Sequence, residues 1–270
     1  MPLISAPDLS ALLGQADLLL LDCRHDLYHP AAGRQAHAEA HLPGAHFLHA
    51  DEDLSGPIIP GETGRHPLPD PAVFRALMGS LGLRPEHTVV AYDDKGGGIA
   101  ARAWWLLRAL GHEKVMVLDG GYPAWVAAGL PTDANPVNRP GGAPPSHLAP
   151  HYQLSTCDRA QVATLPADFL LIDSRTAPRY RGEEEDVDPI AGHIPGAINL
   201  PWPENLQDGR FKSREALKIR FADLRDEADH NVFYCGSGVT ACHNILAYYY
   251  AFGEMPALYP GSWSEWITPA

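Results

Sequence analysis

An internal repeat constrains the fold of this chain more than any other feature of its sequence. Segments of the first half return in the second half in the same order and at similar spacing. LLLLDCR is matched by FLLIDSR, HLPGAHFLHA by HIPGAINLPW, VVAYDD by NVFYCGSG, and LDGGYPAWVAAG by YPGSWSEW. Similarity of this extent between two halves is the signature of a duplicated structural unit. We therefore expect two domains of the same fold.

The repeat preserves single polar and aromatic residues. The matched pairs are Asp22 and Asp173, Arg24 and Arg175, His41 and His193, Tyr92 and Tyr234, Gly120 and Gly261, and Trp125 and Trp266. Because Arg24 and Arg175 occur in both copies, we expect them to be structural partners of the neighbouring aspartates. The same reasoning assigns His41 and His193 to structure.

Each copy alternates short apolar runs with longer helical patterns, which predicts an α/β fold. The apolar runs are expected to be buried strands at residues 18–21, 89–92, 115–118, 169–172 and 232–234. Helices are expected at residues 71–81, 100–110, 214–224 and 239–252. Strands buried on both faces and separated by helices form mostly parallel sheets flanked by helices.

A segment rich in proline separates the two copies. Residues 131–150 contain six prolines and two glycines, a composition that excludes an inner strand or a helix. We therefore predict a first domain over residues 1–132, a semi-rigid linker over 133–150, and a second domain over 151–270.

Charge and cysteine content limit the partners and the compartment. With 20 basic and 33 acidic residues the net charge is −13, which argues against nucleic acid or a membrane surface as a partner. The apolar run at residues 18–21 is too short to cross a bilayer. The four cysteines form no C-x-x-C pair, so we expect neither a disulfide framework nor a zinc site. The expected compartment is a reducing cytoplasm.

The loop after the predicted strand at 232–234 is the candidate site. It reads Cys235-Gly-Ser-Gly-Val-Thr-Ala241 and leads directly into a predicted helix. In open α/β sheets ligands bind at the carboxyl ends of strands, where this cysteine is expected. Glycines let successive N–H groups converge, and the helix directs its positive end at the same point. Such surroundings favour the reactive thiolate. Cys23, Cys157 and Cys242 are expected to be structural or incidental.

The CGSGVTA loop and the doubled D-x-R and H-[IL]-P-G-A motifs resemble the rhodanese-like sulfurtransferases. The tandem arrangement is similar to that of the thiosulfate and 3-mercaptopyruvate sulfurtransferases, over nearly the whole chain. The resemblance implies two rhodanese-like domains, of which only the second is catalytic. Asp93 stands in the first copy where Cys235 stands in the second, and a carboxylate cannot carry a sulfane sulfur.

The resemblance also implies a two-step transfer without a metal or organic cofactor. The Cys235 thiolate takes sulfur from 3-mercaptopyruvate or thiosulfate as a persulfide and passes it to a thiol or cyanide. A thioredoxin-like protein is one candidate acceptor. Arg179 matches the position of the family's substrate-binding arginine and would grip the anionic donor. Residues of the loop would hold the persulfide through their N–H groups: Gly236, Ser237, Gly238, Val239 and Thr240.

The donor is left open by one departure from the family pattern. Mercaptopyruvate enzymes carry a second arginine after the first, but residues 183–191 contain none, and Arg181 lies only two residues beyond Arg179. Thiosulfate is therefore an alternative main donor. The acidic run over 183–188 is expected to be a solvated loop. The hydroxyls of Ser237 and Thr240 are expected either to contact the keto acid and its leaving enolate or to cap the helix.

Three other functions are compared with this interpretation. A phosphatase of related fold needs an arginine six residues after the cysteine, and Ala241 occupies that position. A non-catalytic module for sulfur delivery or sensing remains an alternative. Six histidines lie in residues 25–49, and His37 and His41 have the i, i+4 spacing of shared metal ligands. Because no carboxylate–histidine motif accompanies them, we expect no metal there.

Overall fold

The computed structural model describes residues 1–269, which form two compact units. Unit 1 comprises Met1–Gly56 and Pro69–Gln153, and unit 2 comprises Pro57–Leu68 and the residues from Leu154 onward. The sequence-based division differs from this one in two segments. Residues 57–68, assigned to the first copy, are part of unit 2. Residues 133–150, assigned to a linker, are part of unit 1.

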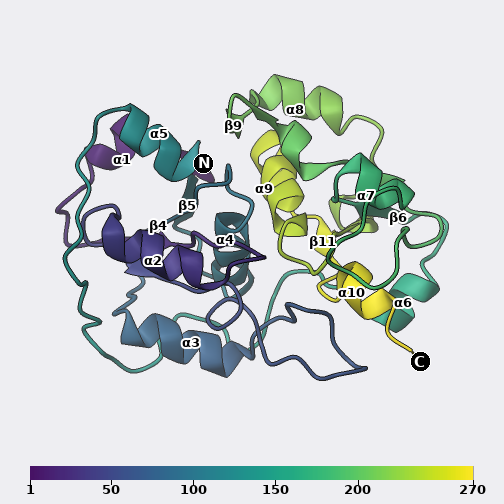
Figure 1. The fold of residues 1–270 in the computed structure, drawn as a ribbon, viewed down its shortest axis with the longest axis horizontal. Coiled ribbons are helices and arrows are strands. Elements are labelled where there is room, and N and C mark those ends of the chain that lie inside the picture. Colours follow the sequence, from purple (N-terminus) through teal and green to yellow (C-terminus); the bar gives the residue numbers. More distant parts are fainter. Residues whose placement is uncertain (270) are drawn as a thin grey trace. The chain divides into compact units, whose positions relative to one another are not determined.

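Unit 1 contains a five-stranded parallel sheet with the strand order β1-β5-β4-β2-β3. Its strands are β1 (Leu3–Ile4), β2 (Leu18–Asp22), β3 (His46–Phe47), β4 (Thr88–Tyr92) and β5 (Val115–Leu118). Its helices are α1 (Ala6–Ser10), α2 (Ala31–Glu39), α3 (Pro71–Ser80), α4 (Ala100–Ala109) and α5 (Gly121–Ala127). Helices α1 and α5 lie side by side (Figure 1).

Unit 2 contains a four-stranded parallel sheet with the order β11-β10-β6-β7. Its strands are β6 (Leu170–Asp173), β7 (Ile198–Asn199), β10 (Asn231–Tyr234) and β11 (Ala257–Leu258), with a separate hairpin of β8 (Leu206–Gln207) and β9 (Arg210–Phe211). Its helices are α6 (Arg159–Ala163), α7 (Ala177–Arg181), α8 (Arg214–Arg220), α9 (Ala241–Phe252) and α10 (Ser262–Trp266), with 3₁₀ turns η1 (Trp202–Asn205) and η2 (Ala228–His230). The order matches β5-β4-β2-β3 of unit 1, so the predicted α/β duplication is confirmed.

Every strand and helix expected from the sequence is present, with small shifts at the ends. Local chemistry explains several boundaries. Asp70 caps α3 through its carboxylate, and Pro71 occupies the first turn, where no amide hydrogen is needed. Gly253 ends α9 with a φ of 83°. The helix expected over 214–224 ends earlier, at Arg220, and the one expected from 239 begins at Ala241.

The repeated D-x-R motif forms the same buried ion pair in both units. Arg24 and Arg175 each clamp the aspartate two residues earlier, with the shortest N–O distances 2.6 Å to Asp22 and 2.7 Å to Asp173. All four side chains are nearly inaccessible to solvent. Burying such charges is tolerated only when they are paired and hydrogen-bonded. The expectation that these arginines are structural partners of the aspartates is confirmed.

The repeated tyrosines, Tyr92 and Tyr234, accept equivalent hydrogen bonds in the two units. The Tyr92 hydroxyl accepts the Leu42 N–H and the Tyr234 hydroxyl accepts the Ile194 N–H, both at 3.2 Å. In each unit this bond ties the H-[IL]-P-G turn to the strand that leads into the candidate loop. Burial raises the pKa of both tyrosines well above the ordinary value, so the hydroxyls stay neutral.

The proline-rich segment over residues 131–150 packs against the rest of unit 1. The Gly141 N–H donates to Ser80 O at 3.0 Å, and the Ala149 N–H donates to Leu110 O at 2.9 Å. A Cβ at Gly79 would lie 2.4 Å from Ala143 O, so this approach requires glycine in α3. Within residues 1–269 no helix has the length and apolar character needed to cross a membrane.

Candidate active site

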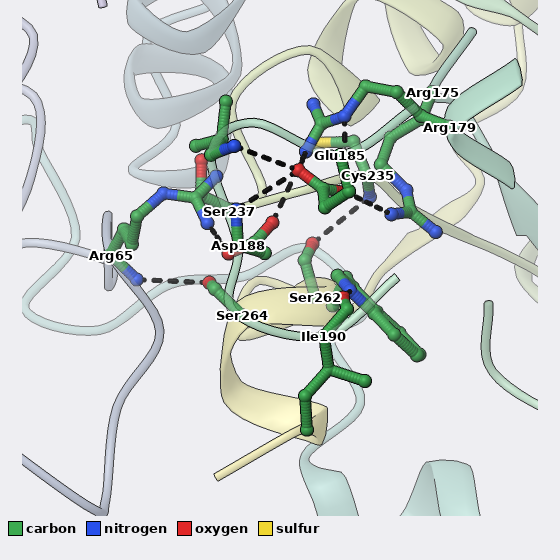
Figure 2. A network of polar contacts seen from close by, with 12 residues as sticks. Arg65, Arg175, Arg179, Glu185, Asp188, Ile190, Cys235, Ser237, Ser262 and Ser264 are labelled. Atoms are coloured by element: carbon green, nitrogen blue, oxygen red, sulfur yellow. Dashed lines mark hydrogen bonds and ion pairs between the residues drawn. The ribbon is translucent and has the colours of Figure 1, made fainter. Parts of the chain in front are cut away.

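The loop between β10 and α9 places Cys235 at the carboxyl end of a central strand, as the sequence predicts. The Cys235 residue is 2% exposed. Its Sγ accepts a hydrogen bond from the Gly238 N–H at 3.1 Å, and its own N–H donates to Ser262 Oγ at 3.1 Å. An N–H aimed at the sulfur stabilises negative charge there, either on a thiolate or on a sulfur adduct. Figure 2 shows this sulfur among charged side chains.

Both glycines of the loop meet a specific steric requirement. Gly238 has a φ of 79°, and a Cβ on it would lie 2.3 Å from Pro260 O. A Cβ on Gly236 would lie 3.0 Å from Arg65 Nη2 and 3.6 Å from Arg179 Nη1. Gly238 therefore permits the turn that directs its N–H at the sulfur. Gly236 leaves room for two guanidinium groups beside the loop.

Arg65 is a residue of the site that sequence reasoning missed. It lies in the segment 57–68, which belongs to unit 2 although it comes from the first half of the sequence. Its N–H donates to Ser264 Oγ at 3.0 Å, which anchors the segment to α10. Burial lowers the pKa of Arg65 from its ordinary value, while attraction to Cys235 opposes that change. The only sequence signal was an Arg-His pair inside a run rich in glycine and proline.

The acidic run after α7 is not the solvated loop expected from the sequence. The side chains of Glu185 and Asp188 are only 3% and 2% exposed. Glu185 lies 2.7 Å from Arg179 Nη2 and 3.3 Å from Arg175 Nη1. Asp188 pairs with Arg65 Nη1 and lies 3.2 Å from Arg179 Nη2 (Figure 2). The expectation is wrong for these two residues because buried guanidinium groups need buried counter-charges.

Ser237 contacts a histidine that was also not predicted. Its Oγ lies 2.7 Å from His66 Nδ1, and both residues are buried. The Thr240 side chain makes no capping hydrogen bond although Thr240 is the first residue before α9. The alternative expectation that the Thr240 hydroxyl caps the helix is therefore wrong. Ser237 and His66 form a buried polar pair, of which Ser237 is two residues from Cys235 in the sequence.

The predicted site residues lie together in unit 2, with different environments. Gly236, Ser237 and Gly238 form the turn itself, and Arg179 extends toward Gly236 from α7. Val239 and Thr240 lead into α9, because their carbonyls accept the N–H groups of Cys242 and His243, each at 3.1 Å. These placements are consistent with an anion site around Cys235, and the roles of the individual residues stay predictions.

The corresponding loop of unit 1 holds Asp93 in place of the cysteine. Asp93 is fully buried. One carboxylate oxygen accepts the N–H groups of Lys95 and Gly97, each at 2.8 Å. The other accepts those of Ile99 at 2.7 Å and Ala100 at 2.8 Å. The unit 1 loop is thus an anion cradle that is filled by its own side chain.

The histidine-rich segment brings two of its members close to a carboxylate. His25, His49 and Asp51 each offer one ligand atom, and these atoms lie within 4.8 Å of one another. Both ring nitrogens of His49 already make hydrogen bonds, at 3.1 Å to Pro30 O and at 3.2 Å to the Asp51 N–H. A metal ion bound to His49 would have to replace one of these two hydrogen bonds.

His37 and His41 make structural contacts within unit 1. Their rings stack with centroids 4.0 Å apart. His37 Nδ1 lies 2.9 Å from the buried carboxylate of Asp22, and His41 Nδ1 lies 2.6 Å from His37 O. Hydrogen bonds from His37 and Arg24 hold the pKa of Asp22 below its ordinary value, against the effect of burial.

Comparison with known proteins gives consistent matches. The family model described as "Rhodanese-like domain" matches residues 5–128 and 158–268. A probable 3-mercaptopyruvate sulfurtransferase of Pseudomonas aeruginosa is 48% identical, over 98% of this chain and 95% of that protein. A putative thiosulfate sulfurtransferase of Mycobacterium tuberculosis is 39% identical, over 98% and 94%. The solved structure of the 3-mercaptopyruvate sulfurtransferase from Leishmania major superposes with a TM-score of 0.86 at 31% identity, over 98% of this chain and 73% of that one.

Proposed function

This chain belongs to the rhodanese family of sulfurtransferases, and we propose that it moves sulfur from 3-mercaptopyruvate to a thiol or cyanide through a persulfide on Cys235. The observation that carries this proposal is the contact of the Cys235 Sγ with the Gly238 N–H, beside two guanidinium groups. A sulfur held by an N–H and flanked by cations suits both a thiolate and the persulfide anion that follows.

In the first step the Cys235 thiolate attacks the sulfur atom of the donor. The new bond joins the two sulfur atoms, and the carbon–sulfur bond of 3-mercaptopyruvate breaks. Pyruvate leaves as its enolate and takes up a proton at carbon, while the enzyme retains a persulfide. In the second step the acceptor attacks the outer sulfur. Cyanide leaves as thiocyanate, or a thiol leaves as a persulfide, and the Cys235 thiolate returns.

Donor binding is assigned to Arg65 and Arg179. A carboxylate can accept hydrogen bonds from both guanidinium groups, which lie beside Gly236. Arg65 thereby supplies the second arginine that the stretch 183–191 lacks. Binding the carboxylate there would leave the donor sulfur directed at Cys235 and would hold the reacting atoms together.

The pair of Ser237 and His66 favours mercaptopyruvate over thiosulfate. Loss of sulfur from mercaptopyruvate generates an enolate that must be protonated, whereas thiosulfate releases sulfite without any proton transfer. A hydroxyl 2.7 Å from an imidazole is a proton relay of the kind used in general acid catalysis. Sulfur transfer from thiosulfate has no proton-transfer step that this pair could assist.

The test of the donor is a comparison of kcat/KM for 3-mercaptopyruvate and thiosulfate with cyanide as acceptor. We expect mercaptopyruvate to be preferred at least tenfold, about 1.4 kcal/mol in transition-state stabilisation. The matched control is Cys235→Ser, which should be inactive with both donors. Equal or better turnover of thiosulfate would contradict the donor assignment. Turnover of neither donor would favour a sulfur-delivery or sensing module.

The acceptor and the compartment are proposed more generally. A thiol acceptor, including a thioredoxin-like protein, is compatible with a persulfide that another thiol must reach. All four cysteines are free in the structure, which is typical of a reducing compartment such as the cytoplasm. Reaction of the persulfide form with reduced thioredoxin, followed by release of sulfide, would test this acceptor.

A further inference from the structure

Asp188 occupies a special position in the proposed donor site. Its carboxylate contacts both arginines of the proposed donor site, through Arg65 Nη1 and Arg179 Nη2. Arg65 Nη2 lies 3.0 Å from the place where a Cβ of Gly236 would lie, and Arg179 Nη1 and Nη2 lie 3.6 and 3.7 Å from it. Both guanidinium groups therefore bind Asp188 and also lie beside the loop at Gly236.

The charges of this network cancel. Three arginines, Arg65, Arg175 and Arg179, face three carboxylates. The carboxylates belong to Asp173, Glu185 and Asp188, and the side chain of each is at most 3% exposed. Without Asp188 the cluster would carry one net positive charge beside Cys235. Because buried charges are weakly screened by salt and water, that unit of charge acts strongly on an anionic donor.

We propose that Asp188 is a specificity-determining residue that selects a donor by its charge. This inference rests on the proposed function of the site. 3-Mercaptopyruvate with its thiol protonated carries one negative charge, and thiosulfate carries two. The Asp188 carboxylate repels a dianion about twice as strongly as a monoanion at the same place. A neutral arginine–carboxylate cluster therefore still binds a carboxylate through hydrogen bonds but disfavours thiosulfate.

The experiment compares donor preference in variants that change one charge at a time. Asp188→Asn keeps the size of the side chain and one acceptor oxygen but removes its charge. We expect the ratio of kcat/KM for thiosulfate to kcat/KM for mercaptopyruvate to rise about tenfold or more in this variant. Arg65→Gln should move the same ratio in the opposite direction. Damage to the fold alone would not produce opposite shifts from the two partners of one ion pair.

The matched control is Glu184→Gln, which makes the same change in net charge in the same loop at an exposed position. We expect its donor ratio to stay within about twofold of the wild type, because solvent screens exposed charges. An equal loss of activity with both donors in Asp188→Asn would overturn the proposal and leave Asp188 a structural support. Absence of activity with both donors in the wild-type protein would instead contradict the proposed function.

A second measurement uses the wild-type protein and does not depend on the folding of a variant. Methanesulfonate and sulfate are similar in shape but differ by one negative charge. As competitive inhibitors against mercaptopyruvate, methanesulfonate should bind more tightly than sulfate. Tighter or equal binding of sulfate would show that the site does not disfavour dianions, and the proposal would fail.

Discussion

The loops after β4 and β10 are two versions of one turn, and they differ in what occupies the centre. In unit 1 the centre holds the carboxylate of Asp93, which accepts four backbone N–H groups. In unit 2 it holds the thiol of Cys235, which accepts the Gly238 N–H. In the first loop the backbone N–H groups bind the loop's own carboxylate, whereas in the second loop the central group is a thiol. The same backbone turn therefore holds a structural carboxylate in one copy and the proposed nucleophile in the other.

The supporting turn after each loop differs in a related way. Gly121 in unit 1 has a φ of 57°, and the matching Ser262 in unit 2 has a φ of 56°. Serine is strained in this conformation, whereas glycine is not. The Ser262 hydroxyl accepts the Cys235 N–H at 3.1 Å and donates to Tyr259 O at 3.0 Å. Of the two matched turns, only the one beside Cys235 carries the strained serine, whose hydroxyl fixes the backbone of this proposed nucleophile.

The largest expected effect comes from moving the unit 1 residue into unit 2. Cys235→Asp should lower kcat/KM at least about 10⁴-fold, because a carboxylate cannot form a persulfide. The fold should persist, since Asp93 shows that this turn accepts a carboxylate. Steady-state assays and mass spectrometry of the protein after incubation with donor would detect the loss of turnover and of the added sulfur atom. Cys157→Ser is the control and should keep full activity; equal loss in both would contradict the assignment of Cys235.

The next largest effect is on the stability of unit 1. Asp93→Asn removes one acceptor oxygen and introduces an amide group that faces buried N–H donors. We expect a loss of about 2–4 kcal/mol in the free energy of unfolding, measured by denaturant titration. Activity per folded molecule should change little. Asp94→Asn, which removes the same charge at the exposed neighbouring position, is the control and should change the stability less. An unchanged free energy of unfolding in Asp93→Asn would show that the four hydrogen bonds do not stabilise the loop.

The sequence predicted the parts of the molecule that depend on local patterns. Runs of apolar residues gave β2, β4, β5, β6 and β10, and the glycines of the loop located Cys235, because both signals are contiguous. The repeat also separated the structural arginines, Arg24 and Arg175, from Arg179. Short strands of two residues, such as β1 and β11, carry no periodicity and were not predicted.

The remaining site residues could not be predicted because long-range packing places them. Arg65 and Cys235 are 170 residues apart in sequence, and no local pattern joins the segment 57–68 to unit 2. Glu185 and Asp188 look like a solvated acidic run until Arg65 and Arg179 are known to lie against them. Burial of a charge is a property of its partner as much as of its own sequence context.

The loops of the two units also differ at Ser237, which has no equivalent in the sequence of unit 1. Variants of Ser237 and of its partner His66 should affect the two donors differently. Ser237→Ala and His66→Gln should each lower kcat/KM for mercaptopyruvate about 10–100-fold, because enolate protonation loses its relay. Thiosulfate turnover should change less than about threefold, because its reaction transfers no proton to carbon. Parallel assays with both donors provide the internal control. Equal losses with both would indicate that the pair only supports the loop.

A smaller effect on stability is expected when Ser262 is replaced by the residue at the matching position of unit 1, which is glycine. Ser262→Ala keeps the unfavourable φ and loses the hydroxyl, which should destabilise the protein by about 1–3 kcal/mol. Ser262→Gly also loses the hydroxyl but relieves the strain, as Gly121 does in unit 1. It should therefore be about 1 kcal/mol more stable than Ser262→Ala. Denaturant titration of both variants tests this order, and the reverse order would mean that the backbone at Ser262 is unstrained.

The smallest effect concerns a histidine that only unit 1 carries after its core helix. His112 follows α4 and Gly111, whereas Glu254 follows α9 and Gly253. Burial and the neighbouring His147 lower the pKa of His112 from 6.5 to about 4. Between these pH values the unfolded chain binds a proton that the folded chain does not, so stability falls as the pH drops from 6.5 towards 4.

The variant His112→Phe should remove part of this acid sensitivity. The difference in unfolding free energy between pH 7 and pH 5 should shrink by on the order of 1 kcal/mol. The control is His29→Gln, which changes an exposed histidine of the same unit and should leave the difference unaltered. Denaturant titrations at the two pH values give the comparison. An unchanged pH dependence in His112→Phe would place the acid sensitivity of unit 1 in other groups, of which His46 and His87, whose pKa values burial also lowers, are the next to examine.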